Sequence, residues 1–310
     1  MGHCIHTTGL NYFFSKKEQV LHDIHLHVPE GSIYGFLGPN GAGKTTTLRL
    51  LLGLLRRQSG DIHIFGQPFD PNRQSILGRI GSLIESPSLY SHLTARENLM
   101  IWQKVYQCPK NRIEAVLRLT GIADTGEKKT GQFSLGMKQR LGIAVALLHA
   151  PRLLILDEPT NGLDPGGIVE MRELLRQINQ ESGITIVISS HLLSEIEKLV
   201  TDVGIIHRGK MQFEGPLDEL MRVRRSHSSL VIETGAPDQA LALAQQTCGE
   251  ARLINGKINL PHQDKTTIAA LNQQFVMADI PVYQITGKED DLESIFMQMT
   301  ATTPTQNPLL

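Results

Sequence analysis

The stretch SIYGFLGPNGAGKTTTLRLLLGLL, residues 32–55, decides the fold of this chain. It opens with a short apolar run, Ser32 to Leu37, which is typical of a buried strand. It closes with a leucine-rich segment, Thr45 to Leu55, whose leucines recur at helical spacing. A glycine-rich turn joins the two. A strand, a turn and a helix in this order predict the start of a parallel α/β arrangement.

The turn between strand and helix matches the pattern GxxxxGK[ST] and predicts a phosphate-binding loop. Glycines allow backbone amides to close around phosphate oxygens, and the helix N-terminus adds unpaired N–H groups. An incidental lysine beside a glycine turn is the alternative, and the correct flanks disfavour it. We expect Lys44 to reach the terminal phosphates and the Thr45 hydroxyl to ligate Mg²⁺. The residues expected to contact the nucleotide here are Gly38, Asn40, Gly41, Ala42, Gly43, Lys44, Thr45 and Thr46.

A second apolar run, Leu153 to Leu156, ends in Asp157 and Glu158. Strands of this kind place polar residues at the carboxyl edge of an α/β sheet, where ligands bind. We expect Asp157 to hold Mg²⁺ and Glu158 to orient and deprotonate the attacking water. General-base assistance of this type is worth about 10²–10⁴ in rate. Without the phosphate loop, an ordinary strand end would be the better interpretation.

Composition limits the possible functions of the 310 residues. The chain carries 30 Lys and Arg against 31 Asp and Glu, a formal net charge of −1, so bulk attraction to nucleic acid or anionic lipid is not expected. Three scattered cysteines without a CxxC pair fit a reducing compartment. The longest apolar runs fall far short of the ~20 residues that span a bilayer, so we expect no transmembrane helix.

The chain divides into two parts of different character. Residues 1–221 alternate strand-like and helical patterns and predict an α/β domain, with a polar-apolar flap at Leu21 to Val28 and Asp61 to Phe65 that is expected to be antiparallel. Residues 222–229 lack periodicity and predict a linker. Residues 230–299 predict a small α+β domain, for which a ferredoxin-like fold is one candidate, and residues 300–310 a disordered tail.

Local patterns supply the elements expected in the second part. Asn255-Gly256 lies between two apolar pairs and predicts a hairpin, because a type I′ turn needs positive φ at both central residues. The expected strands cover residues 230–233 and 281–285, and the expected helices cover residues 237–247, 266–278 and 290–299.

Further motifs make the chain resemble the ATP-binding cassette (ABC) family, the nucleotide-binding subunits of ABC transporters, over roughly residues 5 to 220. The family's signature segment is present as Phe133-Ser134-Leu135-Gly136-Met137-Lys138-Gln139-Arg140, although Leu135 and Met137 depart from the usual residues. Gly162-Leu163-Asp164-Pro165 is similar to the D-loop, and Ser189-Ser190-His191 to the segment carrying the switch histidine.

The resemblance implies a role for each of these residues. Ser134 and Gly136 would contact the γ-phosphate of ATP held by the opposite subunit, with Asp164 at the dimer seam. His191 would reach the γ-phosphate in its own subunit, next to the catalytic Glu158 and Lys44. An aromatic ring would stack on adenine, and Phe14 aligns best, with Phe13 as second candidate.

One departure from the family pattern lies between the phosphate loop and the signature, where most members carry glutamine and this chain carries Glu85. The resemblance places Glu85 beside the Mg²⁺ site of Thr45 and Asp157, where its charge would change metal affinity or coupling to the membrane partner. With the signature segment, Glu85 resembles the subfamily of bacitracin-resistance and lantibiotic self-immunity exporters.

The resemblance implies an ATPase that closes around two ATP–Mg²⁺ between two copies of itself. It would energise a separate membrane-spanning permease at the cytoplasmic face of the cell membrane, through a surface near Glu85 to Glu97, without binding nucleic acid or the transported substrate. Antimicrobial peptide export is the first expectation, and a lipid, a polysaccharide or another substrate remains the alternative. A non-transport ABC ATPase is disfavoured because the chain has one cassette and no heptad run. A GTPase would need an Asn-Lys-x-Asp motif, which is absent.

Overall fold

The computed structural model describes residues 2–85, 87–226 and 228–288 and divides into two compact units, Met1–Leu217 and Asp218–Leu310. The division lies four residues before the boundary expected at residue 221. The helix expected at residues 290–299 and the tail expected at residues 300–310 lie outside the described residues. Among the helices of the described part, none is both long and apolar enough to cross a membrane.

The first unit is built on a six-stranded sheet in which the strand order is β10-β9-β3-β8-β7-β6. β3, β6, β7, β8 and β9 run parallel, and β10 pairs antiparallel with β9. The central strands β3, β7 and β8 are buried over their whole length, as their continuous apolar runs require. The bounds are β3 Ile33–Leu37, β6 Ile80–Leu83, β7 Leu153–Asp157, β8 Thr185–Ser190, β9 Asp202–His207 and β10 Lys210–Pro216.

The strand register brings the chemistry-bearing residues together. At the carboxyl ends of the strands, Leu37 of β3 pairs with Ser190 of β8, and Asp157 of β7 pairs with Ser189 of β8. The phosphate loop after β3, the acidic pair after β7 and the histidine after β8 therefore leave the sheet side by side.

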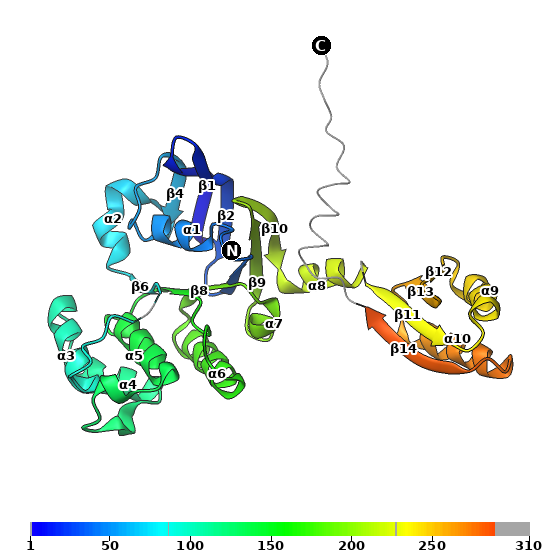
Figure 1. Cartoon of the computed structure of the whole chain (residues 1–310). Helices are drawn as coiled ribbons and strands as arrows, with labels where there is room; N and C mark the ends of the chain where they lie inside the picture. Colours follow the sequence, from blue (N-terminus) through cyan, green and yellow to red (C-terminus); the bar gives the residue numbers. More distant parts are fainter. Residues whose placement is uncertain (1, 86, 227, 289–310) are drawn as a thin grey trace, which may run out of the picture. The chain divides into compact units, whose positions relative to one another are not determined.

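A second, antiparallel sheet has the order β2-β1-β4-β5 and contains the flap expected from the sequence. In this sheet His6 of β1 pairs with His27 of β2 on one side and with His63 of β4 on the other. The ring centroids of His6 and His27 lie 4.6 Å apart. Figure 1 shows α1 between this sheet and the parallel one. The bounds are β1 His3–Ser15, β2 Glu18–Pro29, β4 Ser59–Ile64 and β5 Gln67–Pro68.

In the first unit α1 lies on one side of the parallel sheet and α5, α6 and α7 on the other, with α3 and α4 packed beyond α5 (Figure 1). α3 begins at a capping box in which Thr94 accepts from the Glu97 amide and Glu97 accepts from the Thr94 amide. The helices are α1 Lys44–Leu51, α2 Phe69–Leu77, α3 Ala95–Tyr106, α4 Asn111–Leu119, α5 Leu135–Leu147, α6 Pro165–Ser182 and α7 Leu193–Ile196, with 3₁₀ turns η1 Ala123–Thr125 and η2 Thr130–Gln132.

The predicted linker is mostly helical. α8 covers Leu217–Ser226 and replaces the aperiodic segment expected at residues 222–229. The acidic residues Asp218 and Glu219 lie in its first turn, where they complement the helix dipole. The sequence interpretation weighed the arginines and serines and overlooked this start signal.

The second unit has the element order β-α-β-β-α-β and the antiparallel sheet order β12-β13-β11-β14, which is the arrangement of a ferredoxin-like fold. Asn255 and Gly256 both have positive φ, 51° and 75°, in the two-residue turn that the sequence predicted. The bounds are β11 Ser229–Thr234, α9 Pro237–Cys248, β12 Arg252–Ile254, β13 Lys257–Pro261, α10 Lys265–Met277 and β14 Val282–Lys288.

Candidate nucleotide-binding site

The loop from Gly38 to Thr45 has a backbone that only glycine accommodates at two positions. Gly43 has a φ of 112°, and a Cβ there would lie 2.6 Å from a Leu21 methyl group. A Cβ on Gly38 would lie 2.2 Å from the Ile206 carbonyl oxygen. At these two positions any larger residue would push the loop away from the sheet and from the β2 strand beneath it.

Lys44 is held inside this loop, with 6% of its side chain exposed. Its Nζ donates to the Gly38 carbonyl at 2.6 Å and to the Pro39 carbonyl at 3.3 Å. The same Nζ lies 3.3 Å from Oε1 of Glu158. The ammonium group is thus already directed toward the position where a phosphate would be held.

Thr45 and Asp157 form the oxygen pair expected to hold a divalent cation. The Thr45 hydroxyl donates to Oδ2 of Asp157 at 2.9 Å, and Asp157 is only 6% exposed. Mg²⁺ prefers hard oxygen ligands and keeps several waters or phosphate oxygens. One hydroxyl and one carboxylate fit that preference, provided that a nucleotide supplies further ligands.

Ser189 supports both acidic residues from the neighbouring strand. Its hydroxyl donates to Oδ1 of Asp157 at 2.5 Å and accepts from the Glu158 amide at 2.9 Å. Ser189 is fully buried. Glu158 itself has a φ of 49°, a left-handed conformation that costs about 1–3 kcal/mol and that surrounding contacts must maintain.

The Glu158 carboxylate has a different partner on each oxygen. Oε2 lies 2.8 Å from Nδ1 of His191, and Oε1 faces Lys44. His191 follows β8 directly, so the parallel register explains why it reaches a residue that follows β7. Glu158 therefore contacts both of the other residues predicted to be catalytic, Lys44 and His191.

A hollow of about 340 Å³ lies above the loop. Phe14, at the end of β1, lines it with a ring that is 53% exposed and packs edge-on against Tyr12. Phe13 does not line the hollow, which favours Phe14 of the two predicted aromatic residues. The other lining residues are Glu18, Val20, Pro39, Asn40, Gly41, Ala42, Gly43, Lys44, Thr45, Thr46 and Glu158.

The signature and D-loop residues lie outside this hollow. Ser134 caps α5 by accepting from the Met137 amide at 3.3 Å, and Asp164 caps α6 by accepting from the Gly167 amide at 2.9 Å. Both are exposed. A Cβ added to Gly136 would lie 3.6 Å from a Leu163 methyl group, so the two segments form one continuous edge.

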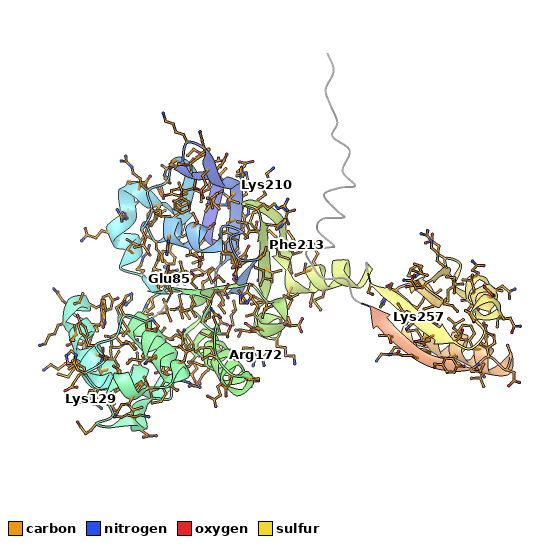
Figure 2. All side chains as sticks on the ribbon, viewed as in Figure 1. Glu85, Lys129, Arg172, Lys210, Phe213 and Lys257 are labelled. Atoms are coloured by element: carbon orange, nitrogen blue, oxygen red, sulfur yellow. The ribbon has the colours of Figure 1, made fainter. Side chains whose placement is uncertain are left out.

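Glu85 forms an ion pair with Arg49 of α1 and contacts neither Thr45 nor Asp157. Its side chain is 65% exposed, and it follows β6 with a φ of 63° (Figure 2). Arg49 lies one helical turn after Thr45 on α1, so its charge, which Glu85 neutralises, belongs to the same helix as the expected metal ligand. The predicted role of Glu85 as a metal ligand remains a prediction.

Three residues of the site were not singled out from the sequence. Ser189 was quoted only as the neighbour of His191, and its alignment with Asp157 depends on strand register, which the sequence does not reveal. Glu18 and Val20 lie at the start of β2, immediately before the flap segment expected from Leu21, and that position was the available signal.

Comparison with known proteins agrees with this geometry. The family model "ABC transporter" matches residues 21–161. The bacitracin transport ATP-binding protein BcrA of Bacillus licheniformis is 48% identical over 307 residues, covering 96% of this chain and 98% of the relative. The lantibiotic transport ATP-binding protein SrtF of Streptococcus pyogenes is 43% identical over 202 residues, covering 65% of this chain and 86% of the relative.

A solved structure places the same fold in the first unit. The structure of cbiO1 from Clostridium perfringens, described as part of the ABC transporter complex cbiONQ, superposes with a TM-score of 0.66 at 30% identity and covers 72% of this chain and 92% of that chain. With a 48% identical relative spanning nearly its whole length, a phosphate loop after β3 and Glu158 beside Lys44 and His191, this chain belongs to the ATP-binding proteins of ABC transporters and is an ATPase.

Proposed function

We propose that two copies of this chain close around two ATP–Mg²⁺ and energise a separate membrane permease that exports a peptide antibiotic. The observation that carries the substrate class is the identity to a bacitracin transport protein across both units, the C-terminal one included. A lantibiotic transport relative supports the same class. Export of a lipid, a polysaccharide or another substrate remains the second candidate.

In this proposal the resting contacts of Glu158 set the order of events. A γ-phosphate bound by Lys44 displaces Oε1 of Glu158, while Oε2 stays with His191 at 2.8 Å. The freed oxygen then faces the phosphate and accepts a proton from the attacking water. Thr45 and Asp157 would hold Mg²⁺, which neutralises charge that develops on the phosphate oxygens.

The exposed edge of Ser134, Gly136 and Asp164 would meet the nucleotide of the second copy. Free amides at the start of α5 form an anion-binding helix N-terminus. The exposed apolar side chains of Leu135 and Val169 lie at the starts of α5 and α6, as an interface requires. The permease would dock near residues 85–97 at the cytoplasmic face of the membrane.

Gly136→Asp tests the dimer, because a Cβ at Gly136 finds only ordinary contact inside one copy. In a Glu158→Gln background, which we expect to bind ATP without turnover, size-exclusion chromatography with ATP and Mg²⁺ should give a dimer. Adding Gly136→Asp should leave a monomer that still binds ATP. A Glu158→Gln chain with wild-type ATPase rate, or a Gly136→Asp chain that still dimerises, contradicts the assignment.

The transport proposal is tested by purifying the tagged Glu158→Gln chain from membranes with ATP and identifying the membrane protein that accompanies it. A host expressing both proteins should gain resistance to bacitracin or a lantibiotic with the wild-type chain and lose it with Glu158→Gln. Unchanged susceptibility to both peptides, together with active ATPase, would reject peptide export in favour of another substrate.

A further inference from the structure

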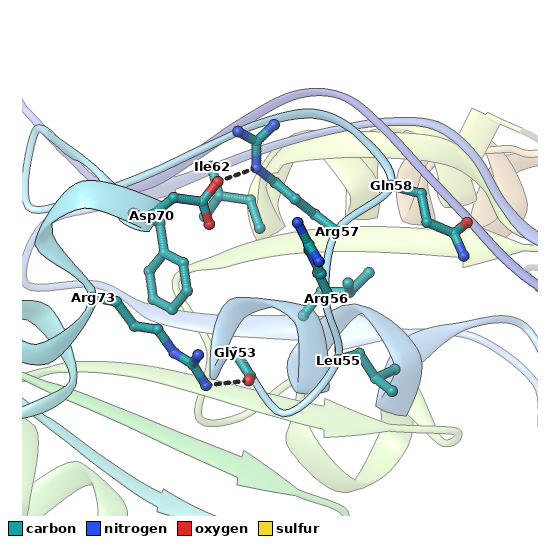
Figure 3. A pocket seen from close by; sticks show the side chains of 10 residues that line it. Gly53, Leu55, Arg56, Arg57, Gln58, Ile62, Asp70 and Arg73 are labelled. Atoms are coloured by element: carbon teal, nitrogen blue, oxygen red, sulfur yellow. Dashed lines mark hydrogen bonds and ion pairs between the residues drawn. The ribbon is translucent and has the colours of Figure 1, made fainter.

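A hollow of about 590 Å³ lies at the far end of α1 from the phosphate loop, in the size range of small-molecule sites. We call it the arginine pocket (Figure 3). Its floor is apolar, because Leu50, Ile62 and Phe69 belong to the buried core. Its full lining is Leu50, Gly53, Leu55, Arg56, Arg57, Gln58, Ile62, Phe69, Asp70 and Arg73.

The three arginines of this pocket are not equally neutralised. Arg57 donates to Asp70 at 2.6 Å and lies 3.3 Å from Asp61. Arg73 donates to the Gly53 carbonyl at 2.6 Å, just after the end of α1, and has no ion pair with a carboxylate of the described residues. Arg56 is exposed and has no hydrogen bond or ion pair with any residue that the structure describes. The pocket therefore presents an excess of positive charge above an apolar floor.

The pocket is connected to the nucleotide hollow through Gln58 on one side and α1 on the other, although the two hollows share no lining residue. Gln58 accepts from the Phe13 amide at 2.7 Å and donates to the Phe13 carbonyl at 2.8 Å. The next residue, Phe14, lines the nucleotide hollow. On the other side, Leu50 belongs to α1, whose first residue is Lys44. A ligand in the pocket would therefore contact two segments. One is the loop at Gln58, which is hydrogen-bonded to β1 next to Phe14, and the other is α1, which begins at Lys44.

We propose that the arginine pocket binds a small anion with an apolar part, such as an aromatic sulfonate or carboxylate, and that its occupation changes ATP affinity. The anion would meet Arg56 and Arg73, and the apolar part would cover Phe69 and Ile62. The two hydrogen bonds between Gln58 and the Phe13 backbone carry the coupling to the nucleotide hollow. Such coupling is reciprocal, so ATP must change the affinity of the anion by the same factor.

The probe is 8-anilinonaphthalene-1-sulfonate, an aromatic anion whose fluorescence rises on binding, titrated into the full chain with excess ADP and Mg²⁺ to fill the nucleotide site. Arg56→Ala should raise its Kd about tenfold, as expected for a lost charge-assisted hydrogen bond. The matched control is Arg118→Ala, because Arg118 on α4 is also exposed and lies outside the pocket. Equal effects of the two substitutions, or loss of probe binding in ADP, would overturn the site.

Coupling is measured by calorimetric titration of ATP into the Glu158→Gln chain with and without saturating probe. We expect the ATP Kd to change about fivefold, within the usual range of coupling between sites. Gln58→Met removes both bonds to Phe13 at similar volume, so it should abolish this change while the probe still binds. If the ATP Kd of the Glu158→Gln chain is the same with and without the probe, the coupling is refuted. If the probe still changes the ATP Kd after Gln58→Met, the link through Phe13 is refuted.

Discussion

Ser189→Ala is the substitution for which the structure gives the sharpest expectation. The change removes one hydroxyl that serves two neighbours, Oδ1 of Asp157 at 2.5 Å and the amide of Glu158 at 2.9 Å. Ser189 is fully buried, so water does not readily replace the hydroxyl. Asp157 keeps its bond from Thr45, whereas the Glu158 amide loses the partner that helps to hold a left-handed backbone.

The magnitude follows from those two bonds. A hydrogen bond to a carboxylate contributes about 1.5–3 kcal/mol, and a buried amide without a partner costs about 1–3 kcal/mol. Together these give an expected loss of about 2.5–6 kcal/mol in the unfolding free energy of the first unit. If half of this loss falls on the orientation of Glu158, kcat falls roughly 10- to 100-fold, at about 1.4 kcal/mol per factor of ten.

The assay is steady-state ATP hydrolysis with thermal unfolding of the same preparations. Ser190→Ala is the matched control, because Ser190 is equally buried but its hydroxyl bonds only to the backbone of Leu192 among the described residues. Ser189→Ala should lower kcat with little change in KM, and Ser190→Ala should leave kcat near the wild-type value. Equal losses in the two variants would show that a general packing defect, and not the support of Glu158, causes the effect.

Three further predictions follow from the same geometry. Phe14→Ala should raise the Kd for ATP about tenfold in a binding titration, since base–aromatic stacking is worth about 1–3 kcal/mol. Phe13→Ala should raise this Kd less, because the Phe13 ring does not line the hollow. Equal effects of the two substitutions would contradict the choice of Phe14. Burial first, and then the neighbouring histidines, lower the pKa of His6 from 6.5, so the unfolded chain binds the proton more tightly and stability is lost as pH falls below about 6.5. His6→Asn should accordingly make the melting temperature fall less between pH 7.5 and pH 5.5. The same fall in the variant and the wild-type chain would show that His6 does not cause it. Glu85→Gln should raise the Mg²⁺ concentration for half-maximal ATPase activity, whereas an unchanged Mg²⁺ curve would indicate that Glu85 serves its ion pair with Arg49 and not the metal.

The sequence predicted the part of the fold that repeats simple patterns. The two apolar runs expected as strands, Ser32 to Leu37 and Leu153 to Leu156, became the central strands β3 and β7, because strands buried on both faces show no alternation. The Asn255-Gly256 turn was equally readable, since its backbone admits few other residues. Features that depend on residues close in sequence, or on one motif, could therefore be predicted from the sequence.

What the sequence did not reveal depends on pairing between distant strands. Ser189 supports Asp157 only because β7 and β8 align in one particular register, and a shift of one residue would turn its side chain to the other face. The pairing of Glu85 with Arg49 also joins segments 36 residues apart. The family pattern, which suggests a metal contact at that position, gave no indication of this partner.

In the proposed mechanism, the contacts of Glu158 link its availability as a base to nucleotide binding. Its two oxygens face Lys44 and His191, so the base contacts the same lysine that a phosphate needs. ATP frees the oxygen that faces Lys44 and leaves the other oxygen with His191, which keeps the base oriented toward the phosphate. Ser134 lies on the exposed edge outside this hollow, so in the proposed dimer the anion site at the start of α5 would come from a second copy. Hydrolysis is then expected only when the phosphate and the partner are both present.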